Sequence, residues 1–194
     1  MNKIFLKSSK ISIWFLGLIF LLNYSCDKKE DDPFSTSGDQ LLLPRIEITT
    51  EATIVDEPKI PAEMKIISDQ YPIESQQIGI EFRGSSSQMF PKKSYGFETW
   101  TNDNQDMDIS IGGYPEEEDW ILYAPYTDKS LVRNVIIYEL SNNIGRYATK
   151  TSFYELFIND DYKGVYVLME KIKRDKNRVA ISKNNDADIS GGYI

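Results

Sequence analysis

The chain has 194 residues, enough for one domain of ordinary size, and its hydrophobic content of 41% is too high for a disordered tail. Its 30 acidic and 22 basic residues give a net charge of -8, which argues against a nucleic-acid partner. There is no histidine, so Ser-His-Asp catalysis and zinc binding through histidine are excluded. The single cysteine, Cys26, can form neither an internal disulfide nor a multi-cysteine metal site.

Residues 1–25 have the pattern of a signal peptide. Three lysines precede the apolar run Ile11–Leu22, which is shorter than the ~20 residues that a membrane-spanning helix needs. Ser25 then precedes Cys26, which is similar to a lipoprotein cleavage box, although Leu22 stands four rather than three residues before the cysteine. We predict lipidation at Cys26 and a membrane-anchored lipoprotein of the cell envelope, in the outer membrane or at the cell surface. The alternative is an ordinary signal peptide with a chance cysteine.

Residues 26–43 are predicted to form a tether, and the folded domain to occupy residues 44–194. The acidic cluster Asp27–Asp32 is either a solvated spacer or, by resemblance, a signal for surface export. The Ser/Gly/Asp-rich segment that follows it, Pro33–Gln40, is typical of a linker. The membrane is therefore expected to contact the protein only through the lipid.

Alternation of polar and apolar residues predicts several strands. It is clearest at Ile78, Ile80 and Phe82. A short apolar run also spans Trp120–Ala124. The predicted strands are 45–49, 64–67, 77–83, 92–99, 152–158, 164–170 and 179–182, with 159–163 as the polar turn of a hairpin.

One main helix is predicted between residues 128 and 144. Thr127 or Asp128 can cap its start, and Gly145 stands in the usual place for its end. The helix is apolar on most sides, so we expect it to be largely buried. Strands, one helix, a hairpin and a further strand together predict an α+β domain, an antiparallel sheet with one main packed helix.

Four segments together resemble the CotH family of atypical protein kinases, and the resemblance covers residues 45–194. Each is weak alone, but they occur in the family's order and approximate spacing. They are Ile80–Ser87 with Phe90–Tyr95, Trp120–Asn134, Phe153–Ile172 and Gly191–Ile194.

The resemblance implies a diverged kinase fold that transfers phosphate from ATP to Ser or Thr of secreted or spore-surface proteins, with Mg or Mn. This region would be the smaller lobe, truncated at its C-terminal side. The metal-binding and catalytic aspartates would lie beyond residue 194, so we assign neither a catalytic residue nor a metal ligand. The implied partners are ATP and an exported protein substrate.

The turn after the third predicted strand is the nearest substitute for a phosphate-binding loop, because the chain has neither G-x-G-x-x-G nor G-x-x-x-x-G-K-[ST]. Arg83 can grip two phosphate oxygens, and Ser85 and Ser86 offer hydroxyls beside a glycine. The alternative is an ordinary Ser-rich hairpin turn.

Lys93 is the predicted phosphate lysine, because alternation places it on the same strand face as Tyr95 and Phe97. Glu139 on the helix is its predicted carboxylate partner. The alternatives are an edge lysine that reaches solvent and an ordinary surface glutamate. Lys92 faces the other side of the strand and serves as the natural control.

By the resemblance, Glu170, Lys171 and Ile172 stand where a kinase hinge contacts adenine through its backbone. The basic run between residues 171 and 178 and the acidic loop pairs, such as Glu117 with Glu118, are interpreted as solvated surface. Two functions remain open at this point. One is a partial fragment of a CotH-like extracytoplasmic kinase, expected to be inactive as this fragment. The other is a lipid-anchored binding or structural module without catalysis.

Overall fold

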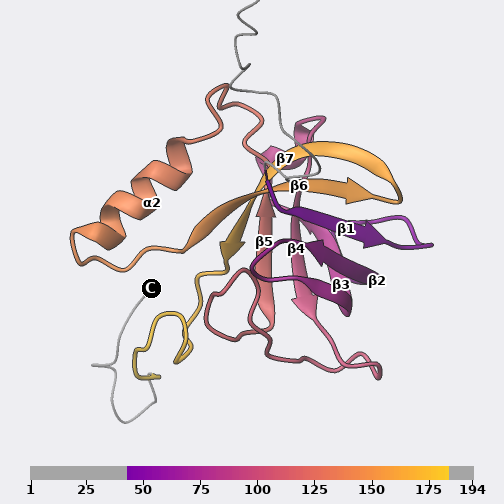
Figure 1. Cartoon of the computed structure of the whole chain (residues 1–194), viewed down its shortest axis with the longest axis horizontal. Helices are drawn as coiled ribbons and strands as arrows, with labels where there is room; N and C mark the ends of the chain where they lie inside the picture. The colour runs from indigo at the N-terminus through magenta and orange to yellow at the C-terminus, as the bar shows by residue number, and fades with distance from the viewer. Residues whose placement is uncertain (1–42, 184–194) are drawn as a thin grey trace, which may run out of the picture. The chain divides into compact units, whose positions relative to one another are not determined.

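The computed structural model describes residues 43–183 as seven strands, one α-helix and one short 3-10 helix (Figure 1). In chain order they are β1 (Arg45–Thr49), β2 (Ile60–Ile67), β3 (Ile73–Arg83), η1 (Ser86–Met89), β4 (Ser94–Thr99), β5 (Asp119–Tyr123), α2 (Arg133–Asn143), β6 (Thr151–Ile158) and β7 (Asp161–Glu170).

The strands form a closed barrel in the order β1-β2-β3-β4-β5-β7-β6. Six neighbouring pairs are antiparallel, and the parallel pairing of β1 with β6 closes the barrel. Asn159 reinforces this seam, because its side-chain oxygen accepts the Thr50 N–H at 2.9 Å and its amide donates to the Thr50 carbonyl at 3.0 Å. Closure gives every strand two neighbours and removes the unpaired edges of an open sheet.

The barrel interior is the main hydrophobic core of the described residues. Successive strand side chains point to opposite faces, so every second residue points inward. The largest fully buried side chains are Trp120, Tyr166 and Phe97. The β6–β7 hairpin turns on Asn159 and Asp160 alone, both at positive φ (50° and 62°), as a two-residue primed turn requires.

The predicted fold class, an α+β sheet with one packed helix, is wrong. The structure is mostly β, with a closed seven-strand barrel and one 11-residue helix. Local alternation predicted most of the strands, but it carries no signal for the pairing of β1 with β6, whose residues are more than 100 positions apart. The predicted strand at 179–182 is absent from the described residues, where Val179 forms only an isolated bridge with Arg174.

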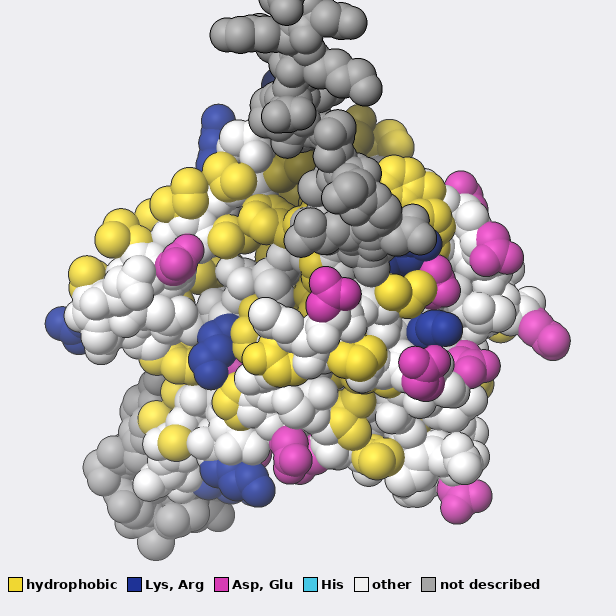
Figure 2. Space-filling view, in the orientation of Figure 1, with side chains coloured by type: hydrophobic (Ala, Val, Ile, Leu, Met, Phe, Trp, Pro, Cys, Tyr) yellow, Lys and Arg dark blue, Asp and Glu magenta, His cyan; other side chains and the backbone are white. Residues whose placement is uncertain are grey.

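The expected burial of the helix is also wrong. α2 has no buried residue, and it meets the barrel mainly through Val135 and Tyr138. Ile137 and Leu140 are 61% and 53% exposed, and Figure 2 shows hydrophobic side chains along the outer edge of this helix. An apolar pattern on all sides does not bury a helix when only one neighbouring surface is present.

The start of the helix matches the sequence prediction in part. The Asp128 carboxylate accepts the N–H of Arg133, the first helical residue, at 2.9 Å and the N–H of Ser130 at 3.0 Å. The helix therefore begins five residues after Asp128, with Val132 at its N-cap position, and Asp128 fixes the turn that leads into it.

We expect a core substitution and a helix-surface substitution to differ sharply in their effect on stability. Leu156→Ala empties a fully buried position and should lower the free energy of unfolding by about 3 kcal/mol. Ile137→Gln changes an exposed position and should lower it by less than ~0.5 kcal/mol. Urea denaturation measures both, and similar losses would contradict the barrel core described here.

Candidate functional site

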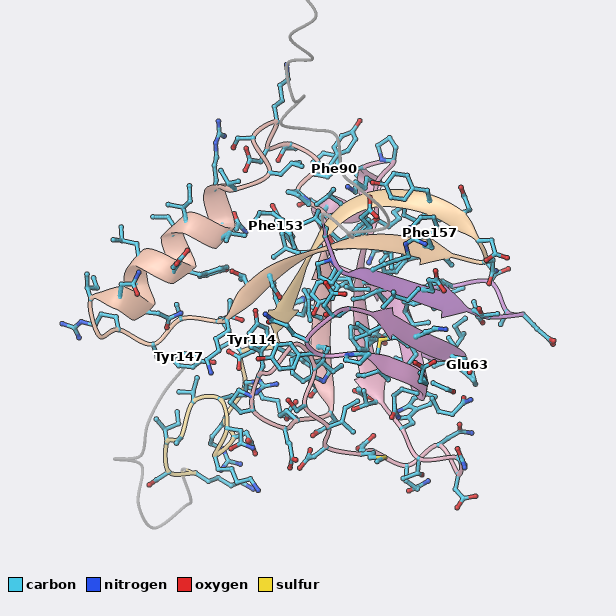
Figure 3. The ribbon with its side chains drawn as sticks, viewed as in Figure 1. Glu63, Phe90, Tyr114, Tyr147, Phe153 and Phe157 are labelled. Atoms are coloured by element: carbon cyan, nitrogen blue, oxygen red, sulfur yellow. The ribbon has the colours of Figure 1, made fainter. Side chains whose placement is uncertain are left out.

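A cavity of about 290 Å³ lies outside the barrel, between the β3–β4 turn, the outer face of β5 and β7, and α2. We call it the helix-side cavity. Ile121 of β5 and Met169 of β7, which are paired across the sheet, line its floor. Asn134 and Tyr138, one helical turn apart, line it from α2. Its floor is thus part of the small apolar cluster that joins the barrel to the helix, in which Phe153 also lies (Figure 3).

Two cations line the helix-side cavity on the side of the β3–β4 turn. Arg83 ends β3, and Lys92 extends toward β7, where its Nζ donates to the Val165 carbonyl at 2.6 Å. Gly164 leaves room for it, since a Cβ there would come within 3.3 Å of the Lys92 Nζ. Burial lowers the pKa of the Lys92 ammonium. None of the described residues that line this cavity is acidic, so its charge favours an anion.

The shape of the β3–β4 turn is fixed from within. Gly84 has φ +108°, and a Cβ there would meet the Ser87 hydroxyl at 2.0 Å. The Gln88 side-chain amide donates to the Gly84 carbonyl at 2.6 Å and to Asp56 at 2.5 Å. Lys93 donates through its Nζ to the Gln88 carbonyl. These bonds hold the turn in the shape in which Gly84 and Ser87 line the cavity.

An aromatic pair ties this turn to the segment that leads into the helix. The rings of Phe90 and Tyr126 stack with their centroids 5.1 Å apart, and both residues line the helix-side cavity. The turn and the β5–α2 segment therefore form adjoining walls of one site.

The predicted phosphate-binding residues divide between two places. Arg83 lines the helix-side cavity, whereas Ser85 and Ser86 are exposed beside it and Ser87 lines it instead. Lys93 does not line it, and Glu139 lines a different cavity of about 270 Å³, between the later part of α2 and residues 149–151. The roles given to Lys93 and Glu139 stay predictions, but the structure does not bring the two residues together at one cavity.

Lys92 was predicted to face away from the phosphate site, because the strand was predicted to begin at residue 92. β4 begins at Ser94, so Lys92 and Lys93 lie in the turn, where strand alternation does not decide which way a side chain points. Asn134 and Tyr138 could have been found from their i, i+4 spacing on the predicted helix.

Glu170, at the expected hinge, does not line the helix-side cavity. It forms buried contacts with two other segments of the chain. It is 1% exposed, and its carboxylate pairs with Arg178 at 3.2 Å and accepts the Lys150 N–H at 2.9 Å. The Arg178 guanidinium lies 4.8 Å from the centre of the Trp120 ring. Ile172 is exposed. These contacts pin the segment that follows β7 against the barrel.

Three carboxylates at the start of β5, those of Glu117, Glu118 and Asp119, lie within 4.8 Å of one another. Lys173 occupies their centre, with its Nζ 2.6 Å from Glu118 and 2.8 Å from Asp119 and also paired with Glu117. Lys171 adds a second bond to Asp119 at 2.7 Å. The lysine supplies the positive charge that a metal ion would otherwise bring, and this part of the basic run is not free surface.

These contacts shift the acidic groups in opposite directions. Burial opposes ionisation of Glu118, but the hydrogen bonds from Lys173, from Asp108 and from the backbone, together with the charge of Lys173, outweigh it and lower the pKa to about 2. Burial likewise opposes ionisation of Asp119, and its bonds to Lys171 and Lys173 lower its pKa all the same. Burial dominates at Glu117 and raises its pKa.

Residues 80–193 match a family model described as CotH kinase protein, and the match covers more than half of the chain. The chain belongs to the CotH family. The family match contains every residue that lines the helix-side cavity, and it begins within β3, after β1 and β2. The resemblance seen in the sequence is therefore confirmed for the family. No curated protein sequence matches the chain.

We expect Lys173→Met to destabilise the protein in a pH-dependent way. At pH 7 the free energy of unfolding should fall by about 2 kcal/mol, less than the ~3–5 kcal/mol for a fully buried pair because the Lys173 side chain is 25% exposed. Glu118 and Asp119 have lowered pKa values, so their contribution is present above the ordinary values of 4.5 and 3.8 and is lost as the pH falls toward about 2. The raised pKa of Glu117 has the opposite effect on stability, because protonation of this carboxyl as the pH falls favours the folded state.

The difference between wild type and Lys173→Met should therefore shrink between pH 4.5 and about 2, as measured by urea denaturation at several pH values. Lys176→Met, on the same basic run but exposed, is the control and should change little. A destabilisation that is the same at every pH would show that Lys173 does not act through these carboxylates.

Proposed function

We propose that the helix-side cavity binds ATP and that the chain contributes this part of a CotH-type protein kinase, which phosphorylates Ser or Thr of exported proteins. One observation carries the proposal. Arg83 and Lys92 both line an apolar-floored cavity whose described lining contains no carboxylate. A nucleotide offers the matching pair of features, an anionic phosphate chain and a flat base.

The residues of the cavity divide between these two parts of the ligand. Arg83, Lys92 and the Gly84–Ser87 turn suit the phosphates, through a bidentate guanidinium, an ammonium and a hydroxyl. Ile121 and Met169 offer an apolar surface to the base. The volume is at the lower limit of about 300 Å³ for ligand sites, so a nucleotide would extend beyond the open side.

Phosphoryl transfer depends on positive charge that stabilises the phosphates and on a carboxylate that orients the attacking hydroxyl. Arg83 and Lys92 would supply the charge. The described residues lining the cavity provide no carboxylate for a catalytic base or for Mg or Mn, so no step is assigned to either. The lack of a carboxylate in the described lining also favours the alternative, a surface module without catalysis. A phosphate-transfer assay with ATP distinguishes a kinase from such a module.

Neighbouring lysines give the sharpest test of ATP binding. We expect Lys92→Met to weaken ATP binding at least ~10-fold, a loss of about 1.4 kcal/mol, because a phosphate contact is removed. Lys93→Met should weaken it less, since Lys93 bonds to the turn and does not line the cavity. Isothermal titration calorimetry measures both. If Lys93→Met abolishes binding and Lys92→Met does not, the phosphate contact belongs to Lys93, as the sequence analysis predicted.

We propose further that the chain is a lipoprotein of the cell envelope, held at the outer membrane or cell surface through Cys26. This position and the tether lie outside the described residues. Within residues 43–183, no helix is long and apolar enough to cross a membrane. The support is the sequence alone, a lone cysteine directly after a signal-like apolar run.

Expression in a Gram-negative host with labelled palmitate tests the anchor. The wild-type protein should take up label and sediment with membranes, and Cys26→Ser should do neither, because the thiol is the acylation site. Uptake of label by Cys26→Ser, or an unmodified Cys26 in mass spectra of the mature protein, would refute lipidation.

A further inference from the structure

A second cavity, of about 330 Å³, lies at one mouth of the barrel. We call it the mouth cavity. It forms where the β2–β3 turn, residues 112–114 and the start of β6 meet, and it shares no lining residue with the helix-side cavity. Nothing in the proposed function uses it.

Hydroxyl groups line the mouth cavity, and their side chains are held in place by burial, hydrogen bonding or ring stacking. Tyr154 is 3% exposed, and the Tyr114 hydroxyl donates to the Ser152 hydroxyl at 2.9 Å. The Tyr114 ring is held by stacking on Trp120, with centroids 6.4 Å apart (Figure 3). Burial raises the pKa of both Tyr114 and Tyr154, so both hydroxyls stay neutral and able to donate and accept hydrogen bonds.

Two adjacent glycines shape the wall of the mouth cavity. Gly112 and Gly113 both have positive φ, at 62° and 76°. A Cβ on Gly112 would lie 3.0 Å from the Tyr154 hydroxyl, and one on Gly113 would lie 2.6 Å from the Tyr71 ring. A side chain at Gly113 would displace the Tyr71 ring. The close approach of the backbone to these tyrosines thus depends on glycine.

The lining excludes most classes of ligand. Among the described residues that line it there is no lysine or arginine, and the one carboxylate, Asp69, would repel a phosphate. A single carboxylate is too few for a Mg or Ca site. An apolar ligand would cover the tyrosine and serine hydroxyls and offer them no hydrogen bond in place of water. An ammonium is best held by several exposed ring faces, but only Tyr71 offers one among the described lining residues, because Trp120 stacks on Tyr114 and Tyr154 is buried in the barrel.

A neutral ligand that carries several hydroxyls and one apolar face remains. We propose that the mouth cavity binds a neutral sugar unit. The hydroxyls of Tyr114, Tyr154 and Ser152 pair with those of the sugar. Asp69 and Gln70 bond to it from the β2–β3 turn, and the Tyr71 ring, 48% exposed, packs against its apolar face. The size suits one or two sugar rings rather than an extended chain.

The test uses the 194-residue protein and ligand-observed NMR with glucose, galactose, mannose and N-acetylglucosamine and their disaccharides. At least one should bind with a Kd on the order of 1 mM. Tyr71→Ala should raise this Kd at least ~10-fold. Tyr147→Ala is the matched control, because Tyr147 is also 48% exposed but lies on the loop after α2 and does not line the cavity. Its Kd should stay within ~2-fold of wild type.

Ser152→Ala provides a second arm if Tyr71→Ala does not melt like the wild type, and it should weaken sugar binding by a similar factor. ATP should not displace the sugar, because the two cavities share no residue. The proposal is overturned if no neutral sugar binds, if glucose 6-phosphate or choline binds in preference, if ATP competes, or if Tyr71→Ala and Tyr147→Ala behave alike. Loss of ATP binding alone would leave it standing, since it does not rest on the proposed function.

Discussion

The parallel pairing of β1 with β6 is the contact on which the rest of the structure depends. It turns a chain of antiparallel neighbours into a closed barrel and so assigns one face of every strand to the interior. With the interior filled by the barrel's own side chains, the outer face of β5 and β7 is left to meet α2 and line the helix-side cavity. The mouth cavity exists for the same reason, because a closed barrel has ends.

Local patterns in the sequence predicted most of the elements but not their assembly. The alternation at Ile78 and Ile80 located β3, and the polar residues around Asn159 located the β6–β7 hairpin. The barrel closure joins segments with no common local pattern, so it could not be read from periodicity. The α2 sequence failed in another way: its apolar residues predict burial, but the described residues provide a neighbour for only one side.

The candidate site was predicted in part, and the errors have a physical cause. Arg83, at the end of a clearly alternating strand, lines the helix-side cavity, and its contact with phosphate stays a prediction. Lys92 and Lys93 were assigned by extending the β4 alternation two residues too far, into the turn. The resemblance describes the stretch around Glu170 as a hinge, and composition describes the stretch around Lys173 as solvated surface. Their roles as buried partners appear only when residues 117–119 and 178 are brought beside them.

The bond between Asn159 and Thr50 has a consequence for the order in which the protein folds. It joins residues 109 positions apart. β1 is synthesised early, and its second edge stays without hydrogen-bond partners until the β6–β7 turn has been synthesised and has folded. Until then β1 and β6 both present unpaired backbone groups, the kind of edge to which a second chain can add. This geometry leads us to expect that barrel closure is a slow step in folding and that a short-lived, association-prone intermediate precedes it. The hydrogen bonds of the Asn159 amide stabilise the paired edges once the barrel has closed.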